Sequence, residues 1–311
     1  MTMDLNSTAP SAASFAERRK KVLQEARRCH GVDALFITKT QDVRYLCGST
    51  EGGNGLLITR RSATLFTSNM FLVRATRESP GVTIRIPETG MMAEAIALCA
   101  KEQRQKLGFQ HTTMTVSQHA DLAQTVLEGS QLVPIGDLVV ICRAVKDEDE
   151  IAWTRAAVGI AETAFLNLLS GGASFFIGRT ERQLAAELDY RMALGGADRN
   201  AFPNGTIVAS GANSYNCHHM PGDRVIQEGD SVLFDWGAEL HGYRSDITRV
   251  VFVRSVPENL GHIYNVVLAA HDAAVEVVGP RVRCHTVDAV ARKIIRQAGY
   301  AKDFRHGLGH G

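Results

Sequence analysis

Two apolar, β-rich runs that flank a short polar turn constrain this chain more than any other feature. The runs cover residues 231–238 and 243–253, and the turn between them contains Gly242. This pattern predicts a β-hairpin. With a four-residue loop that ends at Gly242, Asp235 on the first strand lies directly across from Asp246 on the second.

Two facing carboxylates would repel each other. Facing side chains on antiparallel strands lie about 4.5–5.5 Å apart at Cβ, and like charges there are destabilising. Because Phe234 and Trp236 flank Asp235, water would screen the pair poorly. A cation between the carboxylates would relieve the repulsion and use their oxygens as ligands. Alternatively, one aspartate caps the turn and the other pairs with Arg244 or Arg249, and a one-residue bulge would change the register.

Length and composition exclude several classes of protein. A chain of 311 residues with 45% hydrophobic residues suggests about two domains with ordinary cores. The net charge of +1 gives no electrostatic footprint for nucleic acid or an anionic membrane. The six cysteines form no C-x-x-C pair, which favours a reduced intracellular protein. Because no signal peptide and no apolar run of ~20 residues is present, we expect a cytoplasmic protein without a membrane partner.

Strands alternate with helices in the first half of the chain, after a small polar segment (residues 1–13) that we expect to be disordered. Ser14 and Glu17 form a capping-box pattern that predicts the start of the first helix. The alternation predicts an α/β layer around a mixed or parallel sheet. Strands are expected at residues 33–38, 55–59, 63–68, 83–87 and 107–110, and helices at 14–29, 92–103 and 116–128.

The charged segment at residues 146–150 marks a domain boundary, because the composition shifts there and a long helix begins. The predicted domains are therefore residues 14–145 and 146–311. The second is expected to be α+β, with helices packed on the antiparallel hairpin. Its helices are predicted at residues 150–169, 180–193 (capped by Thr180 with Gln183), 258–278 and 286–298 (capped by Thr286), and a further strand at 205–209.

Histidines in two further places could join the aspartates. One is the loop segment Cys217-His218-His219, and the other is the C-terminal segment that contains His306 and His310 between glycines. Imidazole combined with carboxylates suits Mn, Co, Fe or Zn better than a site made only of oxygen ligands. The alternatives are a partly buried polar loop and a flexible tail.

Together these segments resemble one family. The segment SGANSYNCHHMPGDRVIQEGDSVLFDWGAELHGYRSDITR is similar to the signature of the creatinase/aminopeptidase P/prolidase metallopeptidases, which have the pita-bread fold. FRHGLGHG is similar to the start of the family's next motif. RAVKDEDEIAWTRAAVGIAETAF resembles the first helix of their catalytic domain, and DALFITKTQDVRYLCG resembles their α/β N-terminal domain. The resemblance covers nearly the whole chain in the right order.

The resemblance implies a metal-dependent Xaa-Pro peptidase, of the aminopeptidase P or prolidase type. Asp235, Asp246 and His310 would be ligands of two divalent metal ions, with Mn the first expectation and Co, Zn or Fe as alternatives. His218 would contact the scissile peptide, and His306 would line the substrate pocket. Two metals would make a bridging hydroxide available near neutral pH and polarise the carbonyl that it attacks. The partner would be a peptide with proline at the second position, and the enzyme a homodimer.

Two departures from the family pattern stand out. Cys217 occupies a position where relatives usually carry proline. In addition, the family continues beyond the position of Gly311 with a His-Glu motif and two glutamate ligands, one of which is the general base. We therefore expect the catalytic domain to be incomplete at its C-terminus, and the 311-residue chain to bind metal weakly and to be inactive.

Two other functions remain open. A creatinase-like amidinohydrolase shares the fold and needs no metal, and the retention of both aspartates argues against it. A non-catalytic binding module with the same fold would fit the missing glutamates. The three retained ligands in the family's order favour the peptidase.

Overall fold

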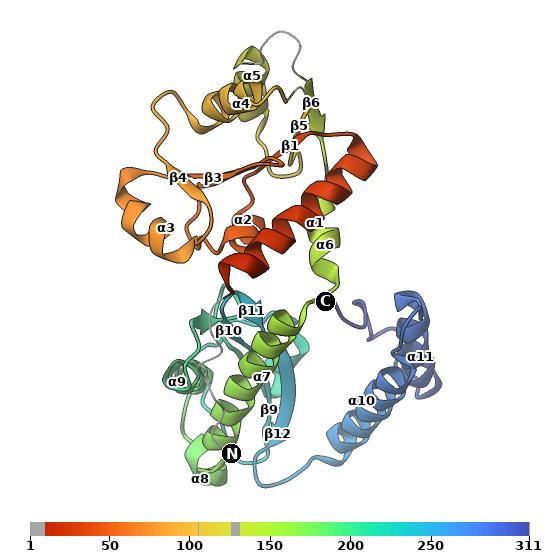
Figure 1. Cartoon of the computed structure of the whole chain (residues 1–311). Coiled ribbons are helices and arrows are strands. Elements are labelled where there is room, and N and C mark those ends of the chain that lie inside the picture. The colour runs from red at the N-terminus through yellow and green to blue at the C-terminus, as the bar shows by residue number, and fades with distance from the viewer. Residues whose placement is uncertain (1–9, 105, 126–130, 311) are drawn as a thin grey trace. The chain divides into compact units, whose positions relative to one another are not determined.

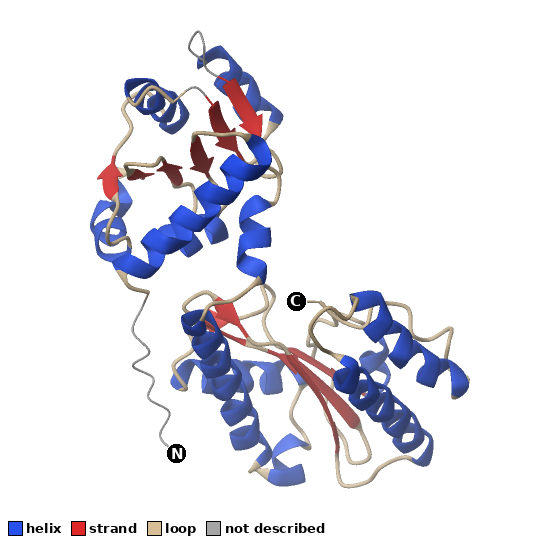
Figure 2. Ribbon diagram, turned by 45° about the vertical axis from the view of Figure 1, so that its right-hand side comes forward, coloured by secondary structure: helices blue, strands red, loops and turns tan. Residues whose placement is uncertain are grey.

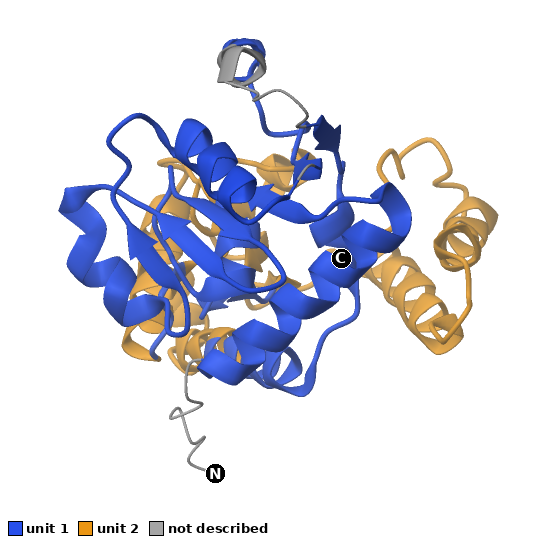
Figure 3. Ribbon diagram, turned by 45° about the horizontal axis from the view of Figure 1, so that its top comes forward, with its two compact units in different colours: residues 1–160, 196–199, 238–245 blue, residues 161–195, 200–237, 246–311 orange. Residues whose placement is uncertain are grey.

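The computed structural model describes residues 10–104, 106–125 and 131–310 (Figure 1). Most of the segment that we expected to be disordered, residues 1–9, lies outside this range. The chain divides into two compact units, coloured separately in Figure 3. The first contains residues 1–160, 196–199 and 238–245, and the second contains residues 161–195, 200–237 and 246–311.

The first unit is built on a six-stranded mixed sheet, as the alternation of strands and helices predicts. The strand order is β4-β3-β2-β1-β5-β6. β1 runs antiparallel to β2 and parallel to β5, and both β3–β4 and β5–β6 are parallel pairs. The strands are β1 (Ala34–Ile37), β2 (Gly55–Ile58), β3 (Ala63–Phe66), β4 (Thr83–Arg85), β5 (Lys106–Phe109) and β6 (Gln131–Pro134).

Helices cover both faces of this sheet. All four residues of β1 are buried. Leu35 and Ile37 belong to one apolar cluster and Ala34 and Phe36 to another, because successive side chains of a strand point to opposite faces. The first cluster includes residues of α1 (Ala12–His30), α2 (Thr40–Cys47), α3 (Leu72–Glu78) and α6 (Leu138–Ala144), and the second includes residues of α4 (Met91–Lys101). In Figure 1, α5 (Val116–Thr125) lies next to α4.

Some boundaries differ from the predictions. α1 begins at Ala12, two residues before the predicted start, and part of the expected disordered segment is therefore helical. The side chain of Ser11 accepts a 3.1 Å hydrogen bond from the backbone N–H of Ser14, so Ser11 is the N-cap and the capping box at Ser14 was wrong. Residues 40–47, for which the sequence predicted no helix or strand, form α2 because Val43 and Leu46 reach the core at helical spacing.

A second, three-stranded antiparallel sheet has the order β12-β9-β8. Its central strand β9 (Ser231–Trp236) presents Phe234 and Trp236 to the helices, and the Trp236 ring stacks on Phe165 at 4.3 Å between centroids. Asp235 points to the opposite face and is half-buried. The other elements are β8 (Ile207–Ser210), β12 (Ile247–Phe252), α7 (Glu148–Leu169), α8 (Gly172–Phe176), the 3₁₀-helix η2 (Gly211–Tyr215) and α9 (Glu181–Leu194). The predicted capping box of Thr180 with Gln183 at the start of α9 is confirmed.

The register of the hairpin differs from the prediction by two residues. Leu240 pairs with Tyr243, so the turn is the two-residue loop His241-Gly242 rather than a four-residue loop. Both turn residues have positive φ, 52° and 87°, as a type I′ turn requires. Asp235 consequently faces Thr248, and the prediction that it faces Asp246 was wrong.

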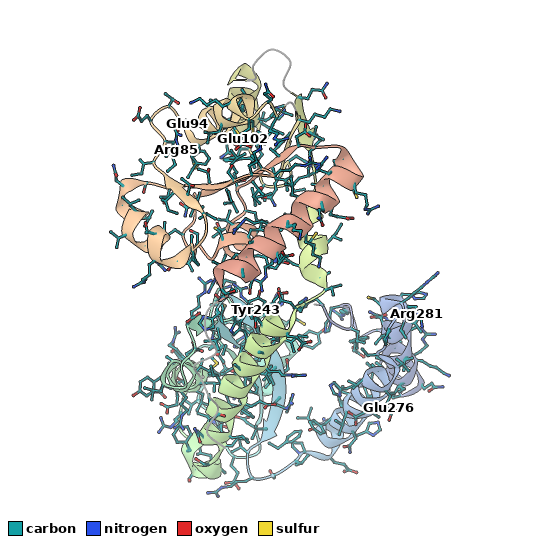
Figure 4. All side chains as sticks on the ribbon, in the orientation of Figure 1. Arg85, Glu94, Glu102, Tyr243, Glu276 and Arg281 are labelled. Carbon is teal, nitrogen blue, oxygen red and sulfur yellow. The ribbon has the colours of Figure 1, made fainter. Side chains whose placement is uncertain are left out.

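The turn end of the hairpin is anchored within the first unit. Tyr243, labelled in Figure 4, packs against Trp153 at 5.3 Å between ring centroids and donates a 2.9 Å hydrogen bond to Glu150. Burial raises the pKa of Tyr243 above its usual value, and the charge of Glu150 adds to this rise. The strands here are β7 (Arg199–Asn200), β10 (Ala238–Leu240) and β11 (Tyr243–Arg244), in the order β11-β10-β7.

The last two helices, α10 (Glu258–Val277) and α11 (Cys284–Gln297), pack against each other (Figure 2). Small buried residues at the contact, Ala270 and Ala274, allow the helices to approach closely. α11 starts after Arg283, so the predicted cap at Thr286 was wrong. Phe304 and Leu308 pack on this helix pair and thereby hold the C-terminal segment. Across the described residues, no helix has the length and apolar character needed to cross a membrane.

Candidate metal centre

Asp235 lies on the central strand of the β12-β9-β8 sheet. It pairs with Ile207 on one side and Thr248 on the other. The Thr248 hydroxyl donates a 2.9 Å hydrogen bond to Oδ1 of Asp235. The sheet therefore holds Oδ1 of Asp235 through Thr248.

Asp246 lies next to Asp235 although the two are not directly opposed. It immediately precedes β12, two residues before Thr248. A displacement of two residues preserves the side of the strand pair to which a side chain points, so both carboxylates belong to the same face. His310 approaches this pair from the C-terminal segment, with its Nε2 at 3.6 Å from Oδ2 of Asp246.

The electrostatics of Asp235 reflect these neighbours. Burial raises the pKa of Asp235 above its usual value, and the negative charge of Asp246 adds to the rise. The hydrogen bond from Thr248 and the charges of His218 and His310 oppose it. The second unit thus brings three of the other four predicted site residues, Asp246, His218 and His310, into electrostatic range of Asp235.

The arginine alternative was wrong for both aspartates. Arg244 donates a 2.8 Å hydrogen bond to Glu239, and Arg249 donates one of 2.8 Å to the backbone carbonyl of Thr248. Among the described side chains, neither Asp235 nor Asp246 forms an ion pair with an arginine.

The donor set fits a divalent cation, since it combines two carboxylates of like charge with an imidazole. It is an open arrangement, because the side chain of His310 is 85% exposed and that of Asp246 is 48% exposed. Within the described range, no three His, Cys, Asp or Glu side chains are close enough together to hold a metal ion. Asp235, Asp246 and His310 are therefore near one another without forming a closed coordination shell.

His218 and His219 face different surroundings. His218 is exposed and has a left-handed backbone conformation, with φ of 57°. Its neighbour His219 is partly buried and donates from Nε2 to Oε2 of Glu181 at 2.8 Å. Cys217 is exposed as a free thiol. The loop thus presents His218 to solvent while His219 is held against the protein.

His306 is placed differently from the other candidates. Its backbone carbonyl accepts a 2.6 Å hydrogen bond from Arg292 of α11, and its ring packs edge-on against Phe304 at 5.2 Å. Among the contacts of the described residues, none joins His306 to Asp235 or Asp246. His306 is a surface residue of the C-terminal segment.

The sequence interpretation missed two residues of this region, Thr248 and Glu181. Thr248 could have been found from its spacing, because it follows Asp246 by two residues and so shares its face. Glu181 is fully buried, although its place in the first turn of a helix predicts only an exposed acidic residue. Its partners lie some thirty to forty residues further along the chain, from Ser210 to Gly222.

Family models match both halves of the chain. The model for metallopeptidase family M24 matches residues 152–311, and the model for the creatinase/prolidase N-terminal domain matches residues 18–145. The chain belongs to metallopeptidase family M24, with a creatinase-type N-terminal domain followed by a pita-bread catalytic domain. The resemblance that the motifs indicate, the fold class and the assignment as an enzyme are thereby confirmed.

Individual relatives cover most of the chain. A protein named Xaa-Pro dipeptidase from Pyrococcus horikoshii is 32% identical over 95% of this chain and 81% of its own length. The structure of the Xaa-Pro dipeptidase from Bacillus anthracis superposes with a TM-score of 0.84 at 30% identity, over 97% of this chain and 82% of the other. The X-Pro aminopeptidase from Thermotoga maritima gives a TM-score of 0.82 at 30% identity, over 92% and 81%.

Proposed function

We propose that this metallopeptidase hydrolyses Xaa-Pro peptide bonds with two divalent metal ions, of which manganese is the first choice. The observation that carries the proposal is the gathering of Asp235, Asp246 and His310 on one face of the hairpin and the C-terminal segment. The names of the relatives, Xaa-Pro dipeptidase and X-Pro aminopeptidase, support the choice of substrate.

Each residue has a proposed part. Asp235 and Asp246 supply anionic oxygens, and His310 supplies a neutral nitrogen, in the combination that Mn, Co, Zn and Fe accept. Bound ions would lower the pKa of a water and polarise the scissile carbonyl. His218, exposed beside the aspartates, would donate a hydrogen bond to the carbonyl oxygen of the substrate. His306 would line the pocket that receives the peptide.

The metal-binding residues all belong to the proposed second domain, residues 146–311. Three ligands, of which Asp246 and His310 have exposed side chains, bind divalent ions more weakly than a closed shell of four to six. We therefore propose that the 311-residue chain by itself binds Mn²⁺ weakly and does not turn over peptide. Homodimer formation and a cytoplasmic location stay predictions.

Hydrolysis of Ala-Pro and Ala-Pro-Ala by the Mn²⁺-loaded protein expressed from its complete gene tests the proposal. Cleavage of either peptide, abolished by EDTA and by Asp235→Asn, is the expected result. Preference for the dipeptide would make the enzyme a prolidase, and preference for the tripeptide an aminopeptidase P. Hydrolysis of creatine without metal, or no hydrolysis of any of the three compounds, would overturn the proposal in favour of the alternatives.

A further inference from the structure

A buried carboxylate organises the loop that carries His218. Glu181 has no exposed surface. Its Oε1 accepts hydrogen bonds from the backbone N–H of Ser210 at 2.7 Å, from the Ser210 hydroxyl at 2.7 Å and from Asn213 at 3.0 Å. Its Oε2 accepts from His219 at 2.8 Å and from the backbone N–H of Gly222 at 3.1 Å. All five donors belong to residues 210–222.

The position of Glu181 favours its ionised form. It is the first residue of α9, where the unpaired N–H groups of the helix favour a negative charge. Burial would by itself raise the pKa of Glu181, but the hydrogen bonds from Ser210, Asn213 and His219 outweigh it and lower the pKa to about 2. Glu181 is therefore a fixed anion at neutral pH.

Backbone hydrogen bonds of Glu181 and Arg182 also attach the loop to the start of α9. The N–H of Glu181 donates to the carbonyl of Arg224 at 3.1 Å, and the N–H of Arg182 donates to that of Gly222 at 3.0 Å. Arg224 in turn donates to the Ser210 hydroxyl at 2.6 Å. Both ends of the loop are thus tied to the start of α9, and only the middle of the loop projects.

His218 occupies that projecting part, between two attachment points. His219 on one side is held by Oε2 of Glu181, and His218 itself has the left-handed φ of 57°, which costs free energy in a residue other than glycine. Such a conformation persists only when the surrounding contacts enforce it. The backbone N–H of His219 donates a 3.2 Å hydrogen bond to the carbonyl of Asn216 and so closes a turn around His218, and the hydrogen bond from the His219 ring to Glu181 anchors that turn to α9.

We propose that Glu181 is a positioning residue of the active site: through His219 and the Gly222 amide it fixes the loop conformation that directs His218 toward the aspartate pair. This inference rests on the proposed role of His218. Glu181 touches neither metal nor substrate in this account. Glu181 affects the reaction only because it sets the orientation of His218.

The variant Glu181→Gln distinguishes the hydrogen bonds accepted by Oε1 of Glu181 from those accepted by Oε2. Its amide oxygen can still accept from Ser210 and Asn213, whereas its NH₂ group then meets the His219 and Gly222 donors, which it cannot accept from. We expect hydrogen exchange in residues 210–222 of the metal-free chain to become at least about tenfold faster. Unchanged exchange in this segment would overturn the proposal.

The catalytic measurement is a double-mutant cycle in the Mn²⁺-loaded protein expressed from its complete gene. Glu181→Gln should lower kcat on the Xaa-Pro peptide by about tenfold with KM nearly unchanged. In the His218→Ala background the same change should have no further effect, because its target is already absent. Additive losses would mean that Glu181 acts independently of His218, and would overturn the positioning role.

A second pair of variants covers the case in which Glu181→Gln does not fold. His219→Leu removes the donor to Glu181, while His219→Gln keeps an N–H donor at that side chain. We expect His219→Leu to lower kcat by about tenfold and His219→Gln to recover most of the loss. Equal losses in both variants would overturn the role of the His219 bond.

A control variant is available on the same helix. Glu187→Gln removes a carboxylate that pairs with Arg191 on the side of α9, outside the loop network, and should leave kcat unchanged. If the wild-type enzyme cleaves no Xaa-Pro peptide, the proposed function fails. In that case the exchange measurement still decides whether Glu181 and His219 order the loop.

Discussion

The hydroxyl of Thr248 donates a 2.9 Å hydrogen bond to Oδ1 of Asp235 from directly across the β9–β12 strand pair. The bond fixes the rotation of the carboxylate within the sheet. Partners of this kind orient metal ligands, and their loss usually costs about 10–100-fold in metal affinity. Thr248 is thus expected to support the metal centre without contacting the metal.

Thr248→Val should weaken Mn²⁺ binding by about tenfold, because valine keeps the shape of threonine and removes the donor. Thr248→Ser retains the hydroxyl and serves as the matched control, with affinity close to that of the wild type. Calorimetric titration of the metal-free chain with Mn²⁺ measures both. Equal affinities for the valine and serine variants would contradict the proposed support of Asp235.

The hairpin could be predicted from its two apolar runs, but its register could not. A His-Gly pair is a weaker signal than Asn-Gly for a two-residue turn, because the short polar side chain of Asn tolerates the positive φ that His241 adopts here. The four-residue and two-residue loops shift the pairing by two positions. Because that shift preserves the face, the inference that Asp235 and Asp246 share a side survived the wrong register.

The burial of Glu181 could not be predicted from its neighbourhood in the sequence. The capping pattern of Thr180 with Gln183 correctly predicts where α9 begins. However, whether a first-turn glutamate is solvated or buried depends on segments that pack there, and these begin at Ser210. Local patterns identify the element, and only the tertiary contacts determine the surroundings of its side chains.

The packing of Phe165 against Trp236 and Phe234 should contribute to the stability of the second unit. Phe165 stacks on Trp236 at 4.3 Å and packs edge-on against Phe234 at 5.3 Å. Phe165→Ala should lower the free energy of unfolding by about 3–5 kcal/mol, because it leaves a cavity beside two aromatic rings.

The neighbouring residue provides the control for this substitution. Leu166 is 64% exposed on the same helix, so Leu166→Ala should change stability by no more than about 0.5 kcal/mol. Urea denaturation followed by tryptophan fluorescence measures both variants. A similar loss in the two would show that helix propensity, not aromatic packing, determines the effect.

Gly242 should tolerate no larger residue in the hairpin turn. Its φ is 87°, and a Cβ atom there would lie 2.9 Å from the guanidinium of Arg44, which donates a 3.1 Å hydrogen bond to the buried Glu239. Gly242→Ala should therefore lower the free energy of unfolding by about 1–3 kcal/mol. Gly52→Ala is the control, since the nearest atom to a Cβ at Gly52 is 3.8 Å away. Equal urea midpoints for the two variants would contradict this account of the turn.

The acid stability of the protein should depend on Glu181. Its pKa is lowered from 4.5 to about 2 in the folded state, so ionised Glu181 stabilises the fold fully above pH 4.5. This contribution, on the order of 3 kcal/mol, is lost as the pH falls from 4.5 through the folded-state pKa of about 2. The difference in unfolding free energy between the wild type and Glu181→Gln should consequently shrink across that window and stay constant from pH 5 to 7. Urea denaturation at intervals of one pH unit measures it, and a difference that is the same at pH 3 and pH 6 would mean that Glu181 is not the ionised anchor of the loop.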